Sequence, residues 1–163
     1  MHETVNTIQW DIDEITRMAK QAIESLATSD RSISPIRYRN VLEELLRIRV
    51  IWASHQRLSE DVYAFLEARD PRFGSSLNEL ASQQRHLSQE LKLLTPAIWP
   101  RSAQLGLNSL RIRAFHTLPL IMLQLEHEEL TVLPLLRRWV YGGAIPNSIV
   151  ERELCDISEM ASA

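Results

Sequence analysis

Apolar residues recur at intervals of three and four through four long stretches of this chain, and this pattern constrains the fold more than any other feature of the sequence. In the first stretch they are Ile8, Ile12, Ile15, Ala19, Ile23 and Leu26. This spacing is that of one face of an α-helix. The sequence therefore predicts a first helix over about residues 4 to 28.

Two further stretches repeat the pattern, and each contains polar interruptions. Pro35 suits the first turn of a helix, because its missing N–H would have no partner there. The stripe that follows consists of Val41, Leu45, Ile48, Trp52, His55, Ser59, Val62 and Leu66. After a proline and a glycine break the pattern, the third stripe consists of Leu77, Leu80, Gln84, Leu87, Leu91 and Leu94. We therefore predict a second helix from about Pro35 and a third helix over the third stripe.

The fourth stretch extends from about Ser102 to about Tyr141 and has the most polar stripe. Its expected inward residues are Thr117, Leu120, Gln124, Glu128, Thr131 and Leu135. Pro119 and Pro134 lie inside this stretch, and each removes a backbone hydrogen bond. We expect a kink or a break near residues 115 to 119 and fraying after Leu133.

The end of the chain predicts a short fifth helix. Gly142 and Gly143 terminate the fourth helix, and Ser148 with Glu151 has the spacing of a capping box. The apolar residues that follow are Ile149, Leu154 and Ile157. Because this strip is too short for a core of its own, we expect it to serve self-association or an unknown protein partner.

Four long helices with short connections predict an all-α fold. Antiparallel neighbours then give an up-down-up-down four-helix bundle over residues 1–145, followed by a helical tail over residues 146–163. A chain of 163 residues is long enough for one such domain to fold without staples, and its 4 glycines are few for a β-rich protein.

Composition excludes several classes of function. The formal net charge of -3, from 18 basic and 21 acidic residues, provides no broad basic field for nucleic acid. The first twenty residues lack the layout of a signal peptide, and no apolar run approaches the roughly 20 residues of a membrane span. Cys155 is the only cysteine. We expect a cytoplasmic protein that binds neither nucleic acid nor membrane.

Two segments resemble a known family. The first is SHQRLSEDVYAFLEARDP, which contains His55, and the second is QLEHEELTVLPLL, which begins at Gln124. Through them the chain resembles the hemerythrin-like family, also called HHE cation-binding domains, over roughly residues 5 to 141. The resemblance implies a four-helix bundle with a di-iron centre. Its ligands would be a His on the first helix, a His and a Glu four apart on the second, a His on the third, and a His and a Glu four apart on the fourth.

The implied ligand positions are mostly occupied by other residue types. They fall on Ile12, His55, Ser59, Gln84, Gln124 and Glu128. Only His55 and Glu128 retain the ligand that the resemblance implies. All six positions also belong to the inward stripes found from periodicity alone. A shift of the third helix by two residues would place His86 inward in place of Gln84, but it would turn leucines away from the core; the pattern favours Gln84, with His86 as the alternative.

This donor set is poor for a di-metal centre. Two divalent ions require several carboxylates and imidazoles, whereas these positions offer one of each, two amides and a hydroxyl. We therefore expect no cofactor, with iron or another divalent metal held by His55 and Glu128 as the alternative. Because an unpaired buried polar group costs roughly 1 to 3 kcal/mol, we also expect one hydrogen-bonded cluster, formed by His55, Ser59, Gln84, Gln124 and Glu128.

The expected function is that of a non-enzymatic binding or regulatory module with a degenerate metal site. The sequence contains no nucleophile beside a base and no glycine-rich phosphate loop, so an enzyme has little support. Two alternatives remain: an iron sensor or store of the hemerythrin-like family, and a bundle that binds a small ligand in a polar core pocket.

Overall fold

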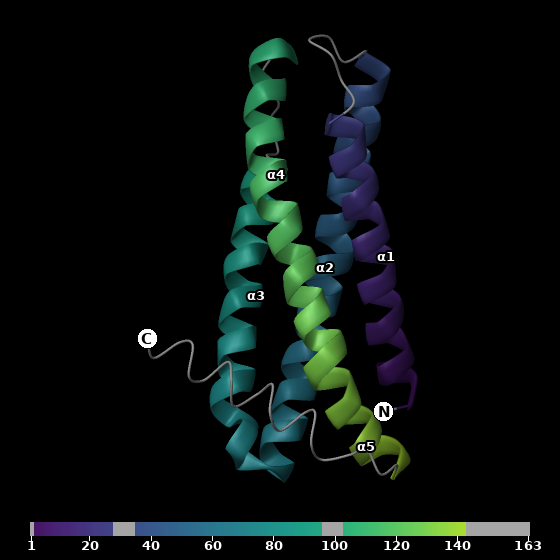
Figure 1. Cartoon of the computed structure of the whole chain (residues 1–163), viewed down its shortest axis with the longest axis vertical. Coiled ribbons are helices and arrows are strands. Elements are labelled where there is room, and N and C mark those ends of the chain that lie inside the picture. The colour runs from purple at the N-terminus through teal and green to yellow at the C-terminus, as the bar shows by residue number, and fades with distance from the viewer. Residues whose placement is uncertain (1, 28–34, 96–102, 143–163) are drawn as a thin grey trace.

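The computed structural model describes residues 2–27, 35–95 and 103–142, and these residues form helices with no strand among them. The elements are α1 (His2–Ala27), α2 (Pro35–Arg69), the 3-10 turn η1 (Pro71–Phe73), α3 (Gly74–Leu94), α4 (Ala103–His127), the π-helical segment η2 (Glu128–Val132) and α5 (Leu133–Tyr141). The long helices lie side by side along the longest axis of the molecule (Figure 1). The predicted all-α class is confirmed.

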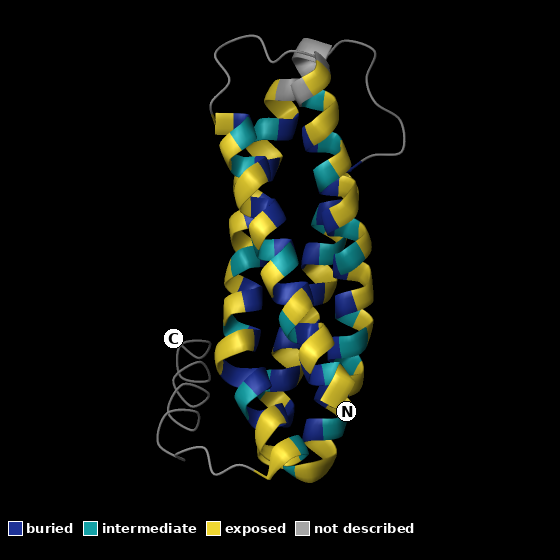
Figure 2. Cartoon of the chain, turned by 90° about the vertical axis from the view of Figure 1, so that its right-hand side faces the viewer, coloured by how far each residue is buried: buried dark blue, intermediate teal, exposed yellow. Residues whose placement is uncertain are grey.

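Each long helix packs against two others. The helix α1 contacts α2 and α4, and α3 contacts the same two helices from the other side. Figure 2 shows buried residues along the inner sides of the helices and exposed residues on their outer sides. A single apolar core therefore runs between the helices.

The predicted core stripes of α2 and α3 are confirmed in full. All eight residues of the α2 stripe and all six of the α3 stripe are buried, including the polar residues His55, Ser59 and Gln84. On α1 the predicted stripe is also buried, except that Ile23 is only partly covered. Because the apolar face of a helix must meet the core, the periodicity was sufficient to orient these three helices.

The stripe predicted for α4 is wrong at one residue. Leu120 is 39% exposed, whereas its neighbour Ile121 is fully buried. Thr117, Gln124 and Glu128 are buried as predicted. Positions 117, 121, 124 and 128 are spaced by four, three and four residues, so Ile121 continues the inward face and Leu120 lies at its edge.

The predicted break near residues 115 to 119 and the predicted fraying after Leu133 are both wrong. The helix α4 runs through Pro119 without a break, and α5 continues to Tyr141 rather than fraying after Leu133. Pro119 is exposed, so the carbonyl that loses its helical partner there can face solvent. A π-helical irregularity lies further along, at η2, which ends two residues before Pro134. At the end of α5, Gly142 adopts a left-handed φ of 64°, which glycine tolerates, and its N–H donates to the Arg138 carbonyl at 3.1 Å.

The predicted fifth helix after Ser148 and the tail over residues 146–163 lie outside the described residues. Within the described ranges, no helix has both the length and the apolar character needed to cross a membrane.

Candidate functional site: a buried polar cluster

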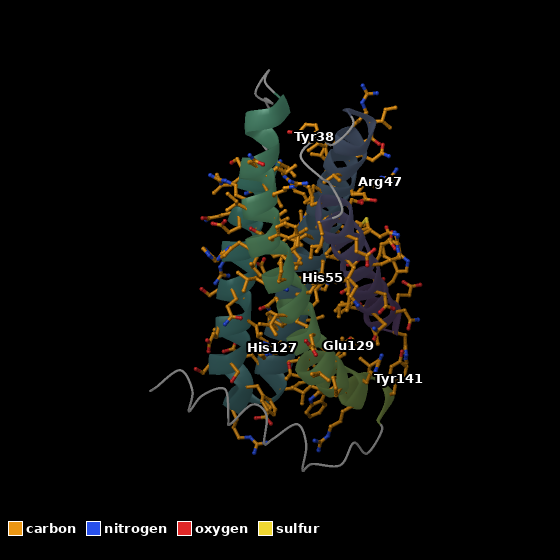
Figure 3. All side chains as sticks on the ribbon, turned by 45° about the horizontal axis from the view of Figure 1, so that its top comes forward. Tyr38, Arg47, His55, His127, Glu129 and Tyr141 are labelled. Atoms are coloured by element: carbon orange, nitrogen blue, oxygen red, sulfur yellow. The ribbon has the colours of Figure 1, made fainter. Side chains whose placement is uncertain are left out.

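A group of polar side chains lies in the core at the level of His55, which is labelled in Figure 3. We call it the polar cluster. Its members are Asp11 of α1, His55, Ser59 and Tyr63 of α2, Gln84 of α3, Gln124 of α4 and Glu128 of η2, and none of them is more than 4% exposed. All the long helices therefore contribute to the cluster.

The carboxylate of Glu128 is the centre of this cluster. Its Oε2 lies 3.0 Å from Nε2 of His55 and accepts from Oγ of Ser59 at 3.1 Å. Its Oε1 accepts from Nε2 of Gln84 at 2.6 Å and from Nε2 of Gln124 at 3.4 Å. A buried carboxylate is costly unless donors surround it, and here each oxygen has two.

His55 lies between two carboxylates. Opposite Glu128, its Nδ1 is 3.4 Å from Oδ2 of Asp11, an ion-pair distance without the alignment of a hydrogen bond. Burial alone would lower the pKa of His55, but the interactions with Asp11 and Glu128 outweigh it and raise the pKa to about 9. The imidazole is therefore protonated at neutral pH, and both of its N–H groups face negative charge.

Tyr63 extends the cluster on the same face of α2, four residues after Ser59. Burial raises the pKa of its hydroxyl above the ordinary value, and the nearby charge of Glu128 adds to this effect. The phenol therefore stays neutral. Four buried atoms of the cluster have no aligned hydrogen-bond partner among the described residues: Oδ2 of Asp11, Nδ1 of His55, the Tyr63 hydroxyl and Oε1 of Gln84.

The π-helical segment η2 begins within the polar cluster. Glu128 is its first residue, and Thr131 and Val132 of the same segment are also buried. A π-helical turn holds more residues than an α-helical turn, so it changes which side chains face inward along the same helix. Such turns often occur at functional sites, and this one coincides with the polar cluster.

The structure brings the predicted cluster residues together. His55, Ser59, Gln84, Gln124 and Glu128 are joined by hydrogen bonds to Glu128, as expected. The third-helix register is the one with Gln84 inward, because Gln84 is fully buried and His86 is exposed. The sixth position, Ile12, is buried in the apolar core at 3% exposure.

Sequence reasoning missed Asp11 and Tyr63. Asp11 follows Ile8 by three residues and precedes Ile15 by four, so it has the spacing of the α1 stripe. Tyr63 follows Ser59 by four residues. Stripes chosen for apolar character excluded the aspartate, although its spacing pointed inward. Asp11 adds a second carboxylate to the cluster, so a carboxylate lies on each side of the His55 imidazole.

The residues of the polar cluster do not fit a di-iron centre. Besides His55 and Glu128, the implied ligand positions offer two amides, a hydroxyl and the hydrocarbon side chain of Ile12, and the amides of Gln84 and Gln124 donate to Glu128 through their nitrogens. In the part of the chain that the structure describes, no group of three or more His, Cys, Asp or Glu residues is arranged to hold a metal ion. The chemistry of these groups is that of a hydrogen-bonded charge network.

We predict that alkaline pH weakens this network. The folded pKa of His55, about 9, lies above the ordinary value of 6.5, so protonated His55 stabilises the fold fully below about pH 6.5. This contribution is lost as pH rises from there towards 9. The free energy of unfolding then falls with a slope that approaches about 1.4 kcal/mol per pH unit. Urea unfolding at stepped pH would measure it. A His55→Gln variant should lack this slope, and equal slopes in both proteins would contradict the assignment.

The chain was compared with protein families, curated proteins and solved structures. No family model, curated protein or solved structure matches the chain.

Proposed function

We propose that the chain is a hemerythrin-like, up-down-up-down four-helix bundle in which a hydrogen-bonded charge cluster has replaced the di-metal centre. It would serve as a non-enzymatic binding or regulatory module. The observation that supports this most directly is the coordination of Glu128 by four donors from α2, α3 and α4. These donors stand at positions where the family resemblance implies metal ligands.

The replacement is chemically coherent. A metal centre needs deprotonated ligands that point at one ion, whereas this cluster pairs one imidazolium with two carboxylates and fills the remaining positions with neutral donors. At three of the four substituted positions the side chain instead donates to Glu128, namely Ser59, Gln84 and Gln124.

An enzyme is poorly supported by the same geometry. Asp11, His55 and Ser59 occur in the order of an acid, base and hydroxyl triad, with Oγ of Ser59 3.4 Å from Nε2 of His55. The hydroxyl of Ser59, however, donates to Glu128, and none of the three side chains is more than 4% exposed. A nucleophile must reach its substrate, and this one is enclosed.

A mononuclear metal site is the second candidate, and Asp11 is the observation that favours it. A histidine that binds a metal through one nitrogen usually donates its other N–H to a carboxylate. His55 has Asp11 beside Nδ1, which would leave Nε2 and Glu128 as the ligands. This candidate requires His55 to lose the proton that its two carboxylates stabilise.

Metal analysis separates the two candidates. We expect protein purified from iron-supplemented cultures to contain far less than one iron per chain and to show no visible charge-transfer absorption. The His55→Ala variant is the control, because iron that persists in it does not depend on the cluster. Near-stoichiometric iron in the wild type that is lost from this variant would overturn the proposal in favour of the metal site.

A further inference from the structure

A groove of about 460 Å³ lies on the surface between α2 and α3. This volume is within the range of roughly 300 to 1,000 Å³ that small-molecule sites occupy. The groove lies outside the polar cluster, and none of the cluster's members lines it.

Three cationic side chains line the groove, and no acidic side chain does. Arg49 and Arg57 are eight residues apart on α2, which is a rise of about 12 Å along one face of the helix. Lys92 faces them from α3. The groove thus presents cations from both of its walls.

These cations are not neutralised by carboxylates within the described ranges. Arg57 donates through Nε to the Ala53 carbonyl at 3.1 Å, and Arg49 donates through Nη1 to Thr95 at the end of α3. Among the described residues, Lys92 makes no hydrogen bond or ion pair. The Nη atoms of Arg57 and the ammonium of Lys92 therefore remain free to bind an anion.

A hydrogen-bonded chain forms the polar part of the groove. The indole N–H of Trp52 donates to Oγ of Ser88 at 2.8 Å, and the hydroxyl of Ser88 donates in turn to Oε1 of Gln56. Gln56 then donates to Glu60, which lies one turn further along α2 and faces Arg85 at 3.8 Å. Glu60 is thus already occupied by partners outside the three cations.

The groove also offers apolar surface. Val50, which is 70% exposed, lines it together with Leu91 and the buried indole of Trp52. A site that combines cations from both walls with apolar surface is suited to a ligand that carries both features. A bare inorganic ion would use only the charges.

We propose that this groove binds a small organic anion, with a phosphate or carboxylate group at Arg57 and Lys92 and an apolar body along Val50. The proposal names a class of ligand for the binding role proposed above. It rests on that proposed function in one respect, that the chain acts by binding. It does not depend on the polar cluster or on the absence of metal.

Calorimetric titration with four probes tests this proposal: phenyl phosphate, benzoate, inorganic phosphate and phenol. We expect saturable binding of phenyl phosphate, benzoate or both, weaker binding of inorganic phosphate and none of phenol. The stronger of the two aromatic anions identifies the head group. Binding should weaken as sodium chloride is raised, because exposed charges are screened. If neither aromatic anion binds saturably, or if phenol binds as tightly as they do, the proposal is overturned.

A pair of double variants assigns the binding to the groove. Arg57→Met with Lys92→Met removes two charges and keeps the apolar stems, so the affinity should fall by about tenfold or more. Lys20→Met with Arg113→Met removes the same charge from exposed positions on α1 and α4 and should leave the affinity unchanged. Equal losses of affinity in both double variants would show a general effect of net charge and would overturn the assignment of binding to the groove. All four positions are exposed, so both variants should melt like the wild type. The iron measurement above tests the proposed function separately, because it reports on the polar cluster alone.

Discussion

Replacing Glu128 with leucine should lower the free energy of unfolding by about 3 to 5 kcal/mol, which is a large part of the stability of a typical domain. The substitution removes the acceptor of four donors and leaves the imidazolium of His55 buried with Asp11 as its only counter-charge. An uncompensated buried charge and several unpaired donors each destabilise a fold. Urea unfolding followed by circular dichroism would measure the loss.

The matched control for this prediction is Glu126→Leu. Glu126 lies two residues earlier in the chain and is exposed, so the same change there should alter stability by no more than about 0.5 kcal/mol. The pair His55→Leu and Glu128→Leu then completes a double-mutant cycle, in which we expect the double variant to lose less than the sum of the single losses. A small loss in Glu128→Leu, or strictly additive losses in the cycle, would mean that the cluster contributes little to folding.

The sequence was sufficient to orient the helices because their apolar faces are long and regular. Stripes such as Leu77, Leu80, Gln84, Leu87 and Leu91 fix the rotation of a helix, and a polar residue in such a stripe can only be buried or break the pattern. That reasoning placed Gln84 rather than His86 in the core. The grouping of His55 with Glu128, which 73 residues separate, rests on the hemerythrin-like resemblance as well, because periodicity gives only the rotation of each helix.

Features that depend on the relation between two helices were not predictable in the same way. The pairing of Asp11 with His55 depends on the relative height of α1 and α2, which the periodicity of either helix leaves open. The sequence predicted a kink or a break near residues 115 to 119, because proline is a common cause of helix irregularity, whereas the helix is unbroken there and a π-helical turn lies at Glu128–Val132. The groove between α2 and α3 was not predictable for the same reason, because it is formed by the outer faces of both helices together.

Restoring the implied ligands should create an iron site if the hemerythrin-like assignment is correct. Four substitutions would place four His and two Glu residues around the site of the polar cluster, together with His55 and Glu128: Ile12→His, Ser59→Glu, Gln84→His and Gln124→His. The metal-free variant should be less stable than the wild type, because a buried isoleucine is lost and a carboxylate is added.

Iron binding should appear as a rise in the melting temperature of this variant when ferrous iron is added anaerobically. Free iron at a thousand times the dissociation constant stabilises the fold by about 4 kcal/mol, which corresponds to roughly 8 to 16 °C for a domain of this size. The wild type should show no comparable rise, and adding Glu128→Gln to the variant should reduce it. A variant that folds yet takes up no more iron than the wild type would contradict the assignment. Because Gln84 is fully buried and bonded to Glu128, the family resemblance would then be at fault rather than the register of α3.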